Sequence, residues 1–270
     1  MNVISYFENE EAQRRALGAC SGFLDGKGWA VSDRLVFYGL SREAFRSNGD
    51  AAGFRRIYEE LVRPARADGW GIARNSAGPL WTAEKTFQVL RDEFSRFEWG
   101  GATTLLNFGT GGAGLTLEPL LEGMRGFKPL RSASNWPVMA VSKVLHFFNA
   151  ELFPVYDNEV IWNLVMTHFL NEFREFCRSF RPRYDTGYTT TFYMNYMSWG
   201  SALLRSAHPR FMQNFAGWLS EFTAADLPRG SFDLSTLYAT AFEFTIIGAY
   251  ADSVGRQEVA ASKVAHCKAS

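Results

Sequence analysis

The chain has 270 residues, 47% of them hydrophobic, so it is long enough and apolar enough to bury a sizeable core. Its 28 basic residues balance its 28 acidic residues, which excludes the global basic charge that drives nonspecific nucleic-acid binding but is compatible with a local basic patch. Three widely spaced cysteines argue against a disulfide framework and indicate a reducing, cytoplasmic location. The sequence shows no export signal and no apolar run of membrane-spanning length, so no membrane partner is expected.

Apolar residues recur at three- and four-residue steps along much of the chain, the spacing of amphipathic helices. This spacing predicts a helix over residues 50–66 and another over 82–97, where Thr82 provides half of a capping box. A long apolar stripe predicts a further helix over 160–176. Two or three more helices are expected over residues 191–206, 209–222 and 235–251.

Strand signals are weak and confined to residues 29–38 and 102–108, neither of which alternates cleanly. The chain is therefore predicted to be mainly α-helical, with at most a few short strands in its N-terminal part. We expect a single helical domain over residues 1–255, with a subdomain boundary near 109–137. Residues 256–270 are expected to form a polar tail or a loose last helix.

Residues Gly109-Thr-Gly-Gly-Ala-Gly114 have the spacing of a dinucleotide-binding loop, in which glycines let a pyrophosphate approach a helix N-terminus. The acidic residue that such a fold needs about 20 positions later is missing, and strands and helices do not alternate around the motif. A Gly-rich turn is therefore favoured over an anion-binding loop. The histidines and cysteines lack metal-ligand spacing, so neither a metal nor another cofactor is expected.

One segment combines an apolar helix, a proline break and two charged residues, an arrangement that can form a catalytic site. It reads Val141-Ser-Lys-Val-Leu-His-Phe-Phe-Asn-Ala-Glu-Leu-Phe-Pro-Val-Tyr-Asp-Asn-Glu-Val160. An apolar helix carrying Lys143 leads to a break at Pro154, and Asp157 then begins a second helix. Aspartate is a favoured N-cap, worth about 1 kcal/mol, and capping alone would explain Asp157. Lys143 either extends to water or is partly buried with a lowered pKa, the condition for a nucleophilic amine.

Residues 153–160, together with the helix before them, resemble the helix-hairpin-helix DNA glycosylase superfamily. The resemblance matches Asp157 to the family's catalytic aspartate, which stabilises positive charge on the sugar as the glycosidic bond breaks, or assists a nucleophile. The lysine that some members use falls on Met139, so Lys143 lies one helical turn later on the same helix face. Residues 131–138 lack the Gly-x-Gly of the family's DNA-gripping hairpin.

The resemblance implies a cleft that receives a base extruded from DNA, because the glycosidic bond is inaccessible inside a duplex. Lys143 and Asp157 are the predicted catalytic residues. The residues predicted to contact the base are Trp136, His146, Tyr156 and Trp162. Those predicted to contact phosphates are Lys128, Arg131, Arg181 and Arg183. Aromatic residues usually fill cores and charged runs usually face solvent, so both sets also have a purely structural interpretation.

Two functions remain open at this point. In the first, the chain is a DNA glycosylase-like protein of repair or defence that recognises or excises a base, with DNA as its partner and no cofactor. In the second, it is a non-enzymatic all-α interaction protein, for example a bacterial defence or stress component, with a vestigial cleft in which Asp157 only caps a helix. Convergence of Lys143 and Asp157 would favour the first. A nucleotide-binding enzyme that uses residues 109–114 ranks last. The sequence indicates neither the substrate base nor the oligomeric state.

Overall fold

The computed structural model describes residues 2–27, 29–46, 51–62, 82–94, 104–109, 138–180, 190–222 and 233–269. All regular elements in these ranges are helices, and no strand occurs among them, which confirms the mainly α-helical prediction. Within the same ranges, no helix combines the length and the apolarity needed to cross a bilayer.

The helices follow one another in three groups along the chain. The N-terminal group contains α1 (Ser5–Glu8), α2 (Glu10–Gly26), α3 (Val31–Arg46), α4 (Ala51–Val62) and α5 (Ala83–Phe94). The central group contains the 3₁₀-helix η4 (Leu105–Asn107), α7 (Val138–Phe148), the π-helix η6 (Asn158–Met166) and α8 (Leu170–Phe180). The C-terminal group contains α9 (Thr190–Ser206), α10 (Phe211–Ser220), the 3₁₀-helix η7 (Leu234–Thr236) and α11 (Tyr238–Ala269).

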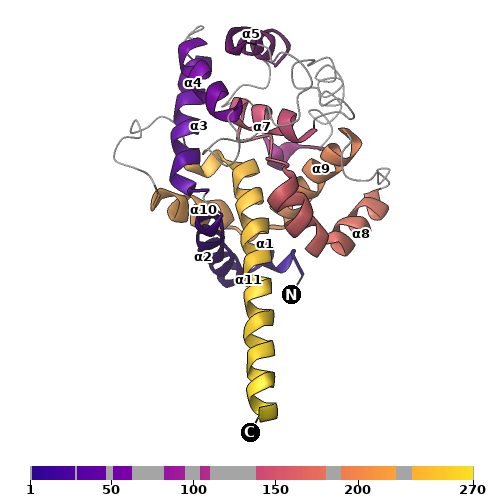
Figure 1. Cartoon of the computed structure of the whole chain (residues 1–270). Coiled ribbons are helices and arrows are strands. Elements are labelled where there is room, and N and C mark those ends of the chain that lie inside the picture. Colours follow the sequence, from indigo (N-terminus) through magenta and orange to yellow (C-terminus); the bar gives the residue numbers. More distant parts are fainter. Residues whose placement is uncertain are drawn as a thin grey trace.

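Helix α11 packs against helices from all three groups. Its first half packs against α2, η6 and α9, and its C-terminal half projects beyond the other helices (Figure 1). It packs against α2 so closely that a Cβ atom at Gly248 would lie 2.0 Å from the carbonyl oxygen of Ala16. Glycine is therefore needed at position 248, because any side chain there would collide with the backbone of α2.

Most of the predicted helices are present. The segments 50–66, 82–97, 191–206 and 209–222 contain α4, α5, α9 and α10. The expected half capping box also forms, because Thr82 Oγ1 accepts a hydrogen bond from the Lys85 amide at 3.2 Å. The apolar stripe over 160–176 is divided between η6 and α8, and α11 continues as a helix from the predicted segment 235–251 through the expected tail.

The two strand signals are wrong where the structure describes them. Residues 31–38 belong to α3, in which Val31, Leu35 and Tyr38 are buried on one face at helical spacing. Residues 104–109 contain η4 instead of a strand. Both segments are rich in apolar and β-branched residues, and burial against neighbouring helices outweighs this weak strand preference.

Candidate functional site

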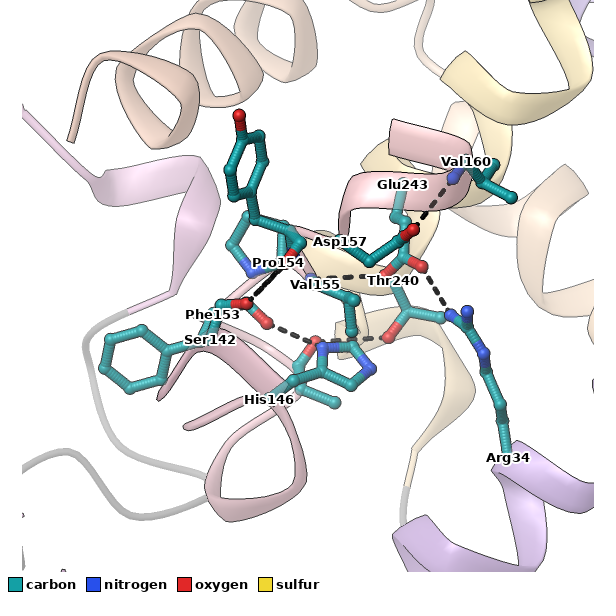
Figure 2. Close-up of polar contacts among 12 residues, drawn as sticks. Arg34, Ser142, His146, Phe153, Pro154, Val155, Asp157, Val160, Thr240 and Glu243 are labelled. Atoms are coloured by element: carbon teal, nitrogen blue, oxygen red, sulfur yellow. Dashed lines mark hydrogen bonds and ion pairs between the residues drawn. The ribbon is translucent and has the colours of Figure 1, made fainter. Parts of the chain in front are cut away.

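After α7 and a turn over residues 149–152, an extended segment, residues Phe153–Asp157, leads to the start of η6 through the interior; we call it the strap (Figure 2). All five of its residues are buried. The Phe153 amide donates to the carbonyl oxygen of Asn149 at 3.0 Å, and Pro154 has no amide hydrogen to donate. The other backbone groups of this buried segment need hydrogen-bond partners from elsewhere. Side chains from the surrounding helices supply these bonds.

Helix α7 binds the strap at two points. His146 Nδ1 donates to the carbonyl oxygen of Phe153 at 2.6 Å. The Ser142 hydroxyl donates to the carbonyl oxygen of Tyr156 at 2.9 Å and accepts from the amide of the same residue at 3.0 Å. These bonds fix the position of the strap along α7, so that the residues following Ser142 and Tyr156, which are Lys143 and Asp157, lie within electrostatic reach of each other.

Helices α9 and α11 bind the middle of the strap. The Tyr193 hydroxyl donates to the carbonyl oxygen of Pro154 at 2.8 Å. Glu243 on α11 accepts from the Val155 amide at 3.3 Å through Oε2. Its other oxygen, Oε1, lies 2.5 Å from Nη1 of Arg34 on α3, and the two side chains are only 0% and 5% exposed, respectively. Four helices therefore converge on this segment, because Arg34 reaches it through Glu243. Figure 2 shows the contacts of His146, Glu243 and Arg34.

His146 is a neutral member of this network. A carbonyl oxygen only accepts, so Nδ1 must carry the proton toward Phe153 and Nε2 must accept from the Tyr38 hydroxyl, which lies 2.5 Å away. The Thr240 hydroxyl lies 3.3 Å from that of Tyr38 and continues the chain of polar groups to α11. Burial, reinforced by the charge of Arg34, lowers the pKa of His146 to about 3. The predicted base-contacting residue His146 thus has both ring nitrogens bonded within the protein.

The two predicted catalytic residues, Lys143 on α7 and Asp157 at the start of η6, lie within electrostatic reach of each other; we call their surroundings the corner. Asp157 is 4% exposed, and its Oδ1 accepts the Val160 amide at 2.8 Å, so it caps η6 as expected of an N-cap. Lys143 is partly exposed. Burial lowers the pKa of Lys143, and Asp157 is the strongest influence in the opposite direction. The corner therefore contains an amine whose pKa is lowered and, within electrostatic reach of it, a carboxylate.

The helix that Asp157 begins has an unusual geometry. The Trp162 amide donates to the carbonyl oxygen of Asp157 at 2.9 Å, five residues back, as in a π-helix. Such turns are rare and frequently occur at functional sites. Trp162 itself is half-buried and packs edge-to-face on Phe192, with ring centroids 5.3 Å apart. It retains some exposed surface close to the corner.

Tyr156 has a different environment from Trp162. Its ring is fully buried and packs against Phe192, Tyr193 and Tyr196, with centroid separations of 5.3 to 6.5 Å. This aromatic cluster joins the strap to α9 and accounts for the position of Tyr156 in the core. The remaining predicted site residues, Trp136, Lys128, Arg131, Arg181 and Arg183, lie outside the described residues.

The glycine motif is described only at its first residue. Gly109 has a φ of +79°, a left-handed conformation that glycine adopts without strain, and it follows η4 where a dinucleotide-binding unit would have a strand. Residues 110–114 lie outside the described ranges. In the part of the chain that the structure does describe, no group of three or more His, Cys, Asp or Glu side chains is placed to hold a metal ion.

No protein-family model, curated protein or solved structure matches the chain. The chemistry of the corner is therefore inferred from its own residues. Sequence patterns identified Lys143 and Asp157 but missed the Arg34 and Glu243 pair. A usable signal existed, since Glu243 is the sole charged residue between Tyr238 and Tyr250, and an acid in so apolar a helix needs a buried partner.

Proposed function

We propose that this protein is a DNA glycosylase-like enzyme in which Lys143 and Asp157 act together on the glycosidic bond of an extruded nucleotide. The observation that supports this most is the position of a partly exposed lysine beside a buried aspartate at the start of a π-helix. The strap and α7 bring these residues within electrostatic reach of each other. Asp157 lies where the resemblance to the helix-hairpin-helix glycosylases has the catalytic aspartate, whereas Lys143 lies one helical turn after the family's lysine position. A lysine whose pKa is lowered, with a carboxylate in its neighbourhood, is typical of catalytic sites.

The chemistry that we propose uses the neutral form of the lysine amine. Nζ of Lys143 attacks C1′ of the sugar, the bond from C1′ to the base nitrogen breaks, and the base leaves with that electron pair and takes up a proton. The carboxylate of Asp157 stabilises the positive charge that develops on the sugar. One of the two protons on the attached amine nitrogen goes to the departing base. The bond between C1′ and the ring oxygen O4′ then breaks, O4′ takes up the second proton, and an imine remains between Nζ and C1′. A lowered lysine pKa favours this sequence because it increases the neutral fraction near pH 7.

A second candidate is the non-enzymatic interaction protein. The observation that favours it is the extent to which the corner is satisfied internally. Asp157 already accepts the Val160 amide and is almost wholly buried, and both nitrogens of His146 are bonded to protein. An aspartate that only caps a helix would have the same geometry. This candidate forms no covalent intermediate, so a test for that intermediate separates the two functions.

The test is reductive trapping on a DNA duplex that carries one abasic site. The sugar aldehyde condenses with a lysine amine with loss of water, and cyanoborohydride delivers hydride to the imine carbon to give a stable secondary amine. We expect the wild-type chain to form a covalent protein–DNA adduct and Lys143→Gln to form none. Lys85→Gln, which removes an exposed lysine on α5, is the matched control and should trap normally.

Asp157→Asn separates charge from capping. Asparagine caps helices about as well as aspartate, so the fold should persist. Trapping on a duplex that still carries its bases requires the glycosidic bond to break, and on that substrate we expect adduct formation to slow by at least about 100-fold. An unchanged rate in Asp157→Asn would remove the proposed role of the carboxylate. Absence of any wild-type adduct, or an equal yield from Lys143→Gln, would favour the interaction protein.

A further inference from the structure

The carboxylate of Glu243 has two separate tasks in the structure. Oε1 pairs with Arg34 on α3, whereas Oε2 accepts the amide of Val155, two residues before Asp157. The guanidinium of Arg34 also lies 4.9 Å from the centroid of the Phe244 ring, which keeps it over the same turn of α11. The pair thus links α3 and α11 to the strap.

The ion pair between Arg34 and Glu243 is not explained by a contribution to stability alone. Both side chains are almost fully removed from water, and the desolvation of two charges offsets much of their attraction. Apolar residues of similar volume would join α3 to α11 at least as well. What apolar residues cannot supply is an acceptor for the Val155 amide or a charge near the corner.

We propose that Arg34 and Glu243 are positioning residues for the site formed by Lys143 and Asp157, an inference that rests on the proposed function. Glu243 fixes the strap through Val155, so that Asp157 meets Lys143 in one geometry. Arg34 holds Glu243 through their ion pair, and its charge disfavours the protonated form of Lys143.

The charges that surround Lys143 come from three helices and the strap. Asp157, Glu159 and Glu243 favour its protonated form, whereas Arg34 and burial disfavour it. The effect of Arg34 on the pKa of Lys143 exceeds the opposing effect of Glu243. Removal of both charges should therefore raise the pKa of this lysine and move amine-dependent chemistry to higher pH.

The first experiment measures the rate of reductive trapping on abasic duplex DNA across pH in R34M/E243Q. The amide oxygen of the new glutamine can still accept from Val155, and no buried charge is left without a partner. We expect the rate profile to shift to higher pH, so that the rate near pH 7 falls several-fold while the maximal rate is retained. Arg34→Lys keeps the positive charge and should keep the wild-type profile.

The second experiment uses R34M/E243M, which also removes the acceptor for Val155. Because misplacement of a reacting group by about 1 Å can cost on the order of 100-fold, we expect the maximal rate to fall by roughly 10- to 100-fold in addition to the pH shift. Thermal unfolding of each variant reports its stability separately. A purely structural pair would change the unfolding temperature and leave the pH profile where it was.

The outcomes distinguish the two proposals. If the wild-type chain forms no adduct, or if Lys143→Gln traps equally well, the proposed function and the positioning role both fall. If those two proteins behave as expected but the double variants keep the wild-type rate and pH profile, only the positioning role is overturned. R34Q/E243Q, whose amides can still bond to each other, replaces R34M/E243Q in the same assay if the latter does not fold.

Discussion

Two regions of the interior are held together by different forces. Where α2 crosses α11, the contact is close and apolar, with Gly248 against the backbone of Ala16. Around the strap, the helices meet through hydrogen bonds and the buried pair of Arg34 and Glu243. The first region stabilises the fold by removing apolar surface from water. The second must first desolvate its polar groups and recovers that cost only if every group is paired.

This difference indicates how the two regions contribute to stability, and the polar region is the one that contains the proposed site. A polar interior specifies one arrangement of its groups, and it contributes less to stability than an apolar interior of the same size. The strap has the properties expected of a rigid support for a reactive site, because its backbone groups are bonded by side chains from several helices. The apolar contact where α2 crosses α11 has no comparable polar network among its described residues, and its role is to stabilise the fold. Variants in the two regions should therefore behave differently.

The largest loss of stability is expected when the buried pair is broken on one side. Glu243→Ala leaves the Arg34 charge buried without its partner and should reduce the free energy of unfolding by about 3–5 kcal/mol, measured by denaturant titration. R34M/E243M removes both charges and should cost less, because only the Val155 amide is left without its acceptor. Equal losses in the single and double variants would contradict the view that the pair adds little net stability.

A methyl group at the helix crossing should have the next largest effect. Gly248→Ala places a Cβ against the Ala16 carbonyl and should destabilise the protein by about 1–3 kcal/mol or more, because the two backbones must separate. Gly255→Ala is the matched control on the same helix, where a Cβ would have no neighbour within 4 Å. It should stabilise the protein by about 0.4–1 kcal/mol. The same sign for both substitutions would show that the crossing is looser than the structure indicates.

Acid should weaken the polar region through His146. Burial lowers the pKa of His146 from 6.5 to about 3, so below about pH 6.5 the unfolded chain takes up a proton that the folded chain does not. This contribution to stability is complete above the unfolded pKa and is lost as the pH falls toward the folded one, by up to about 1.4 kcal/mol per pH unit. His146→Gln lacks this contribution.

The measurement is the free energy of unfolding of the wild-type chain and of His146→Gln at about pH 7 and about pH 5. The stability difference between the two proteins should narrow at the lower pH. A difference that stays constant with pH would show that the His146 imidazole is protonated equally in the folded and unfolded states.

The smallest effect is expected for an ion pair at the surface. Arg55 on α4 contacts Glu84 on α5 with 60% and 46% of their side chains exposed. Solvent and salt screen such pairs, so Arg55→Gln should leave the midpoint of thermal unfolding unchanged within measurement error. A clear decrease would mean that exposed and buried pairs stabilise this fold to similar extents.

Helical periodicity was sufficient to predict the fold class and most helices from α4 onward. It did not predict α2, although Asn9 caps this helix by accepting the Ala12 amide at 2.9 Å, with Glu10 and Glu11 in its first turn. The strand predicted over residues 29–38 was wrong because apolar and β-branched residues occur both in strands and on the buried faces of helices such as α3. Local patterns report helix caps and faces well only where their polar and apolar sides are distinct.

The sequence predicts less of the candidate site than of the fold. Lys143 and Asp157 are 14 positions apart, and a helix followed by a proline break is enough to suggest that they meet. Arg34 and Glu243 are 209 positions apart, and their pairing depends on how α3 and α11 pack. Likewise, the two bonds of His146 come from Tyr38 and Phe153, which no spacing rule connects. Long-range polar partners are set by tertiary packing.

The central claim is that the Lys143 amine is a nucleophile at a site that Asp157 completes. The most direct measurement is peptide mapping by mass spectrometry of the adduct trapped by cyanoborohydride on abasic duplex DNA. We expect the deoxyribose remnant on the peptide that contains Lys143, and its loss in Lys143→Gln. A remnant spread over exposed lysines such as Lys85, or no adduct at all, would contradict the claim.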